Sequence, residues 1–289
     1  MPELPEVQTI ITDLNKKIKG DMIVGFWTDW PKAIKNKSVK NFTREIKGRK
    51  ILGARRIGKN IFIDLSGGKT IYIHLKMTGH LLVKNQKSKI KNQKYFREKV
   101  NLYIHHVWKL KAQNAKLKTL EFSDLRKFGK ILLVDTGKLR EIKEIKELGV
   151  DIISPGFTQK FFNALLDKKQ NKKIRDILMD QRLISGIGNI YASEILYEAG
   201  MLPVILAKNI NSQERTKLYN SIKEVLEKAI KLRGTSDSDY RDTSGAPGSF
   251  QKVLRVYRCE GQPCRKCGTM VKRIRMGQRS AFYCPRCQH

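Results

Sequence analysis

The stretch CRKCGTMVKRIRMGQRSAFYCPRC, residues 264–287, contains two C-x-x-C pairs separated by 16 residues. Each pair places two thiols on one tight turn, and two such turns at hairpin distance supply a closed tetrahedral zinc site. A redox pair is the alternative, but a redox motif would not occur twice on so short a spacer. The sequence therefore predicts one structural Zn²⁺ ion in a C-terminal finger and leaves Cys259 as a free thiol. The predicted ligands are Cys264, Cys267, Cys284 and Cys287.

The finger and the whole chain are strongly basic. The 289 residues include 59 Lys and Arg against 27 Asp and Glu, a formal net charge of +32. Nucleic-acid phosphates attract such a chain regardless of base sequence. The alternative is that the high charge reflects a lysine bias of the whole genome and not a polyanionic partner. We see no clear basic amphipathic helix, no lipid-anchor motif and no apolar run of about 20 residues that would span a bilayer. We therefore expect a nucleic-acid partner, no membrane, and a location in the cytoplasm.

Hydrophobic periodicity predicts an α+β multidomain chain. Apolar residues at helical spacing predict an amphipathic helix just after the N-terminus. Residues 22–135 contain about eight short strands without long helices, which is typical of an antiparallel β-sandwich or barrel. Within them, residues 84–99 form a polar, lysine-rich insertion that we expect to be a mobile loop. From Glu141 onward the period is helical.

These patterns give three predicted domains. Residues 1–136 form an N-terminal catalytic domain of helix and antiparallel β-sandwich. Residues 137–250 form a helical domain that ends in a flexible loop at 234–250, rich in Gly, Ser and Asp. Residues 251–289 begin with the strand-like QKVLRVY and contain the zinc finger.

Three motifs in order carry a resemblance to a known family. PELPEV at residues 2–7, GIGNIYASEIL at 186–196 and the terminal Cys₄ finger together resemble the bacterial formamidopyrimidine-DNA glycosylase family. Members remove 8-oxoguanine and ring-opened purines from damaged double-stranded DNA. The resemblance implies a helix–two-turn–helix in the helical domain. It also implies a monomeric glycosylase and AP lyase of base excision repair, acting on DNA in the bacterial nucleoid by β,δ-elimination.

The resemblance implies that Pro2 is the nucleophile, once Met1 is removed to free a secondary amine. At an ordinary α-amino pKa of about 7.7–8.0, roughly a quarter of the terminal amine is neutral near pH 7.4. For a lysine with a pKa near 10.4, about 0.1% of the amine is neutral at that pH. The resemblance also implies that Glu3 is the acid–base residue and that Glu6 supports it. It also implies a phosphate and elimination role for Lys59, whose neighbour Asn60 departs from the family's usual aromatic residue.

An enzyme that acts on a stacked base must extrude it and fill the space left behind. The resemblance implies that Met77 fills this void, Phe128 wedges the neighbouring step and Arg126 reads the estranged cytosine. Lys76 replaces the glycine that the family has before Met77. The resemblance implies four phosphate ligands, His74, Arg97, Asn171 and Asn189. It implies that Arg279 binds phosphates beside the lesion and assists the second elimination. It also implies that Tyr240 belongs to a lid that covers the lesion.

Two rival functions remain open at the level of sequence. Endonuclease VIII shares the catalytic end but prefers oxidised pyrimidines; the PELPE start, instead of PEGPE, and the RKFG motif argue against it. A DNA-binding zinc protein without catalysis is the rival from another class. Comparing excision of 8-oxoguanine with excision of thymine glycol distinguishes the proposed family from endonuclease VIII. Borohydride trapping of a covalent adduct distinguishes an enzyme from a non-catalytic DNA-binding protein.

Overall fold

The computed structural model describes residues 1–85, 93–237 and 239–289, and the chain divides into two compact units. Unit 1 comprises Met1–Lys146 and Leu232–Gln251, and unit 2 comprises Glu147–Lys231 and Lys252–His289. The predicted boundaries placed residues 234–250 with the helical domain, whereas here they pack with the N-terminal residues. None of the helices in these described ranges has the length and apolarity to cross a bilayer.

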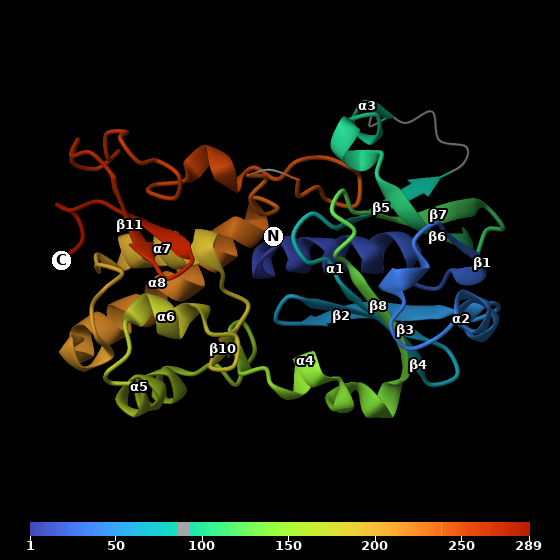
Figure 1. Cartoon of the computed structure of the whole chain (residues 1–289), viewed down its shortest axis with the longest axis horizontal. Helices are drawn as coiled ribbons and strands as arrows, with labels where there is room; N and C mark the ends of the chain where they lie inside the picture. The colour runs from blue at the N-terminus through green and yellow to red at the C-terminus, as the bar shows by residue number, and fades with distance from the viewer. Residues whose placement is uncertain (86–92, 238) are drawn as a thin grey trace. The chain divides into compact units, whose positions relative to one another are not determined.

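Unit 1 is built around a β-sandwich, as predicted. Its described residues form two four-stranded sheets with the orders β1-β6-β7-β5 and β2-β3-β4-β8 (Figure 1). All neighbouring strands are antiparallel. The strands are β1 (Met22–Thr28), β2 (Ile51–Ile57), β3 (Asn60–Leu65), β4 (Lys69–His74), β5 (His80–Asn85), β6 (Ile104–Lys111), β7 (Leu117–Ser123) and β8 (Lys130–Asp135).

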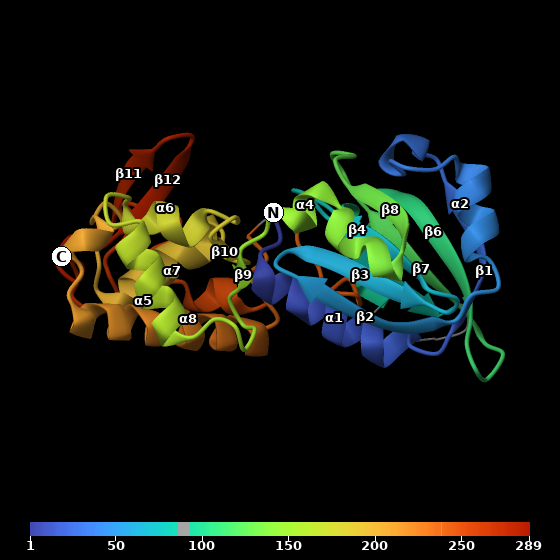
Figure 2. The same cartoon turned by 90° about the horizontal axis from the view of Figure 1, so that it is seen from below.

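Helix α1 (Leu4–Ile18) fixes the N-terminus to the sandwich. Its apolar residues Val7, Ile10 and Leu14 are fully buried, because they recur on one face at helical spacing. The helix contacts β2 and β3 of one sheet and β5 of the other, and Figures 1 and 2 show it running along the sandwich. The first residues of the chain are therefore held by core packing.

The segment Leu232–Gln251 is bound to α1 by buried polar groups. Arg233 donates to Asp13 at 2.6 Å and to Asp242 at 2.7 Å. These two carboxylates raise the pKa of the Arg233 guanidinium above its ordinary value, although burial opposes them. Thr243 also donates to Asp13, at 2.9 Å. We expected a flexible loop here; its described residues are held by this network, and Ser238 lies outside the described residues.

The polar insertion at residues 84–99 is described only in part, because residues 86–92 lie outside the described residues. The short helix α3 (Gln93–Phe96) follows them. Unit 1 also contains α2 (Val39–Ile46), whose N-terminus is capped by the Ser38 hydroxyl, and α4 (Lys143–Lys146).

Unit 2 contains both the predicted helical segment and the finger, which the sequence analysis treats as two domains. Residues 180–188, which include β10, join α6 to α7 in the expected helix–two-turn–helix, and the β11–β12 hairpin packs on α7 (Figure 2). The elements are α5 (Gln159–Lys168), α6 (Ile174–Met179), α7 (Asn189–Ala199), α8 (Ser212–Lys231), the parallel pair β9 (Val150–Asp151) and β10 (Ile184–Ser185), β11 (Lys272–Met276) and β12 (Arg279–Tyr283).

The prediction of a strand at QKVLRVY is wrong. Phe250–Val253 forms a 3₁₀ turn instead. The backbone N–H groups of residues 255–257 donate to the buried carboxylate of Glu194 in α7 at 2.8–3.0 Å. Because these donors are taken by a side chain, this stretch does not need a neighbouring strand.

Buried histidines should make unit 1 sensitive to acid. Burial lowers the pKa values of His74, His80 and His106 to about 4, because it disfavours the charged imidazolium. The unfolded chain takes up these protons near pH 6.5, so stability present above that pH is lost as the pH falls towards 4. For the fully buried His80, lowering the pH from 6.5 to 5 should cost about 2 kcal/mol.

Urea unfolding at pH 7 and pH 5 measures this loss. His80→Gln should reduce the difference between the two pH values, whereas His289→Gln, at an exposed position in unit 2, should leave it unchanged. An equal pH dependence in His80→Gln and the parent protein would contradict the assignment.

Candidate active site and nucleic-acid interface

The N-terminal site gathers Pro2, Glu3 and Glu6 at the start of α1. All three are buried, with Glu3 3% and Glu6 1% exposed. One oxygen of Glu6 accepts the Glu3 backbone N–H at 2.7 Å, and the other accepts the Thr235 N–H, also at 2.7 Å. The Glu6 carboxylate therefore orients the residues beside Pro2, and two carboxylates lie next to the terminal segment.

Gly234 allows this close approach. Its φ is +80°, and a Cβ built there would lie 2.6 Å from a Glu6 carboxylate oxygen. Only glycine fits both the left-handed backbone and the contact.

Lys59 lies in the turn between β2 and β3 and is 6% exposed. The side chain of Asn60 holds this turn, since its oxygen accepts the Tyr72 hydroxyl at 2.9 Å. Gln8 of α1 accepts the Arg56 Nε–H at 2.7 Å, which brings the turn to the first part of α1. The structure thus places Lys59 on the same end of unit 1 as Pro2. Asn60, a departure from the family pattern, supports the turn by hydrogen bonding.

His74, at the end of β4, is a neutral hydrogen-bond donor. Its Nδ1 accepts the Lys76 N–H at 2.9 Å, so the ring proton is on Nε2. Burial, and then the positive charges of Lys76 and Lys59, lower the pKa of His74 to about 4. The ring can donate to a phosphate without carrying a charge.

Met77, Arg126 and Phe128 meet on the surface of unit 1, and we call them the wedge cluster. Met77 and Phe128 are unusually exposed for large apolar residues, at 46% and 51%. Arg126 Nη1 lies 3.1 Å from Met77 Sδ, and its guanidinium carbon lies 4.6 Å from the centre of the Phe128 ring. Arg126 thus contacts both of the other residues expected to act with it at a DNA stack, and its contact with Phe128 is a cation–π contact.

The residue before each apolar member of the wedge cluster is a lysine in the left-handed backbone conformation. Lys76 and Lys127 both have φ of +55°. This conformation costs a non-glycine residue about 1–2 kcal/mol, which explains why glycine is expected before Met77. The lysine at that position does not prevent the turn from forming.

Three further predicted contacts are Arg97 and Tyr240 in unit 1 and Asn171 in unit 2. Arg97 is exposed after α3, and Asn171 is exposed between α5 and α6. Tyr240 is only 6% exposed, within the core of unit 1, and its hydroxyl lies 3.4 Å from the Glu6 carbonyl oxygen. Contact between Tyr240 and DNA would require its side chain to leave that core.

Unit 2 holds Asn189 at the start of α7 beside a buried arginine that the sequence analysis missed. Arg175 is 2% exposed, and its Nη2 donates to Asn189 Oδ1 at 2.6 Å and to the Ser280 carbonyl of β12 at 3.4 Å. Its Nε is buried and has no hydrogen-bond partner among the described residues. Burial and the charge of Arg279 lower the pKa of this guanidinium. Such a cluster of donors and positive charge suits an anion.

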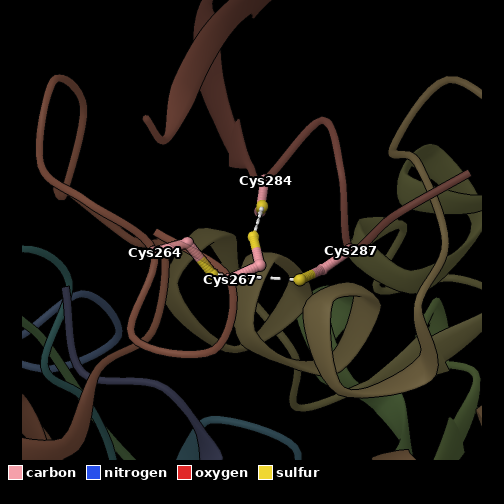
Figure 3. Close-up of side chains that lie close together, drawn as sticks. All are labelled: Cys264, Cys267, Cys284 and Cys287. Carbon is pink, nitrogen blue, oxygen red and sulfur yellow. Dashed lines mark hydrogen bonds between the residues drawn. The ribbon is translucent and has the colours of Figure 1, made fainter. Parts of the chain in front are cut away.

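The four predicted cysteine ligands converge at the base of the β11–β12 hairpin, where their side chains point toward one another (Figure 3). Their sulfur atoms all lie within 4.8 Å of one another, with Cys264–Cys287 at 3.9 Å and Cys267–Cys284 at 3.5 Å. A tetrahedral zinc with Zn–S bonds of about 2.3 Å separates its sulfurs by about 3.8 Å, so the residues fit one Zn²⁺. Cys259 is outside the cluster.

The surrounding residues tie the metal centre to unit 2. The hydroxyl of Tyr197 in α7 lies 3.3 Å from Cys264 Sγ, and Gln288 donates to the Met201 carbonyl at 2.7 Å. With the Glu194 contacts to residues 255–257, they hold the finger against α7. Four thiolates complete a tetrahedral zinc site, so a bound metal would have no open position for chemistry.

The chain matches three family descriptions in order. Residues 1–131 match the "Formamidopyrimidine-DNA glycosylase N-terminal domain", residues 148–241 the "Formamidopyrimidine-DNA glycosylase H2TH domain", and residues 261–289 the "Zinc finger found in FPG and IleRS".

Individual relatives are similar over the full length. The formamidopyrimidine-DNA glycosylase of Pelotomaculum thermopropionicum is 37% identical, over 100% of this chain and 99% of the relative, and that of Carboxydothermus hydrogenoformans is 38% identical over 100% of both. Among solved structures, Lactococcus lactis Fpg bound to abasic-site DNA superposes with a TM-score of 0.85 at 29% identity, covering 100% of both chains. A MutM complex with DNA containing carbocyclic 8-oxo-G gives 0.83 at 30%, again covering 100% of both.

Removal of the metal should unfold the finger and leave unit 1 folded. Elemental analysis should find one zinc per chain, and Cys264→Ser should abolish it and weaken binding to duplex DNA by about tenfold or more. The thermal unfolding temperature of unit 1 should change little. Cys259→Ser is the matched control and should retain zinc and DNA binding; equal behaviour of the two serine variants would refute the assignment.

Proposed function

The chain belongs to the formamidopyrimidine-DNA glycosylase family, and on that premise we propose that Pro2 is the nucleophile with which it removes damaged bases. Its activity is that of a DNA glycosylase and AP lyase that acts on oxidised purines in DNA repair. The observation that supports the proposal most directly is the buried start of α1, where Glu3 and Glu6 flank Pro2 and Glu6 accepts backbone hydrogen bonds on both oxygens.

The proposed reaction begins with the Pro2 amine, freed by removal of Met1. Its lone pair attacks the sugar C1′, the glycosidic C1′–N bond breaks, and the base leaves with the bonding electron pair and takes up the proton that the Pro2 nitrogen loses. Glu3 donates a proton to the sugar ring oxygen, so the ring opens to a Schiff base between C1′ and Pro2. Met1 is 44% exposed beyond the buried proline, where it is accessible for removal.

Elimination from the Schiff base then cuts the strand. Loss of a C2′ proton expels the 3′ phosphate, and a second elimination expels the 5′ phosphate. We propose that Lys59 and Arg279 neutralise these phosphates and that His74 donates to one of them. These steps need no redox or nucleotide cofactor, and zinc serves the fold of the finger.

Damaged duplex DNA is the proposed partner, in keeping with the DNA complexes of the relatives. The wedge cluster would enter the stack where the base is extruded, and Asn189 with Arg175 would bind a backbone phosphate. We place the protein in the bacterial cytoplasm, acting on the chromosome as a monomer.

Borohydride reduction tests the nucleophile. A duplex with 8-oxoguanine opposite cytosine should yield a covalent adduct, and peptide mapping should place it on Pro2 of chains that lack Met1. Chains that retain Met1 should give none. An adduct on Lys59 would assign the chemistry to the lysine, and complete absence of an adduct would favour a non-catalytic DNA-binding protein. Slower excision of thymine glycol distinguishes the activity from that of endonuclease VIII.

Glu3→Gln separates base removal from strand cleavage. The amide keeps the size of the side chain but cannot donate the proton, so excision of 8-oxoguanine should fall by about 100-fold or more. Trapping at a preformed abasic site should persist, because the base is already gone. Glu141→Gln, at an exposed position in unit 1, should match the parent protein in both assays.

A further inference from the structure

A buried carboxylate fastens the two loops that carry the wedge cluster. Asp124, in the β7–β8 loop, is 3% exposed and has no part in the chemistry described above. Its Oδ1 accepts the hydroxyl of Thr78 from the β4–β5 loop at 2.5 Å, and its Oδ2 accepts the Gly129 N–H at 2.7 Å. The Thr78 oxygen in turn accepts the Arg126 N–H at 3.1 Å. One side-chain pair thus joins the loop of Met77 to the loop of Arg126 and Phe128.

The same two loops close around one aromatic ring. A Cβ on Gly79 would lie 2.6 Å from the Phe122 ring, and a Cβ on Gly129 would lie 2.5 Å from it. Phe122 is fully buried, so neither loop can shift inward. The Thr78–Asp124 hydrogen bond opposes separation of the two loops, because it joins one to the other.

The loops need such a link, because their own backbones resist the observed conformation. Lys76 and Lys127 both adopt left-handed φ values immediately before Met77 and Phe128. Strained residues persist where the surrounding contacts hold them in place. Asp124 supplies those contacts on one side: it accepts the Gly129 N–H, and its backbone carbonyl accepts the Lys127 N–H at 3.1 Å.

We propose that Asp124 and Thr78 are positioning residues, which hold Met77, Arg126 and Phe128 as one rigid probe and thereby set how strictly the enzyme reads the base opposite the lesion. The inference rests on the proposed function of the wedge cluster. Arg126 is placed by the Thr78 hydroxyl through its backbone and by Met77 and Phe128 through its side chain. Loosening the link would let the guanidinium sample positions that suit a wrong partner base.

Single-turnover excision of 8-oxoguanine opposite cytosine and opposite adenine tests this role. Asp124→Asn removes one acceptor, and Thr78→Val removes the hydroxyl at nearly constant size. Each should lower the cytosine-over-adenine preference by about tenfold, the effect of one buried hydrogen-bonded link. Thr78→Ser keeps the hydroxyl and should restore the preference. The double variant should be no worse than either single one, because the two residues act as one link.

Two controls separate positioning from general damage. A single-stranded oligonucleotide with a preformed abasic site has no opposite base, so borohydride trapping on it should be unchanged in these variants. Asp21→Asn removes another buried carboxylate of unit 1, bonded to Lys118 at 3.0 Å, and should leave the preference intact.

Three results would overturn the inference. The first is an unchanged preference in Thr78→Val and Asp124→Asn. The second is an equal loss in Thr78→Ser and Thr78→Val. The third is a parallel loss on both duplexes and on the single strand. Absence of trapping in the parent protein would instead overturn the proposed function itself.

Discussion

The carboxylate of Glu6 joins the start of α1 to Thr235, which lies 229 residues further along the chain. Its two oxygens accept the N–H of Glu3, beside the proposed nucleophile, and the N–H of Thr235. The order of the terminal segment, the burial of Glu3 and the course of the chain at Gly234 all depend on this one acceptor. A group whose two oxygens are both engaged cannot rotate, so the geometry at Pro2 is set before any substrate binds.

Part of this architecture is readable from sequence because it follows from local spacing. Two C-x-x-C pairs specify the zinc ligands, since chelation needs only the reach of two turns, and the sulfur positions agree. The 3.6-residue apolar period likewise predicts α1, and the run of short strands predicts the sandwich. The roles of Pro2, Lys59 and the wedge cluster depended on a family resemblance, because nothing in a lone proline or methionine indicates chemistry.

The features that sequence could not supply depend on distant partners. Arg175 looks like one more charge among 59 basic residues until its burial between Asn189 and Ser280 is known. Glu194, inside the apolar stretch IYASEIL, is a signal that could have been noticed, because a carboxylate on a buried helix face must find donors. The misassigned strand at residues 251–257 has the same origin, because the N–H groups of its last three residues donate to that glutamate.

The discontinuity of unit 1 affects its folding during synthesis. Met1–Lys146 leaves the ribosome first, yet Asp13 and Glu6 receive their partners Arg233 and Thr235 only after some 220 further residues. At about 5–20 residues per second, roughly 10–40 s pass between the synthesis of these carboxylates and the synthesis of their partners. The catalytic end of the molecule is therefore among the first parts to be translated and among the last to be completed.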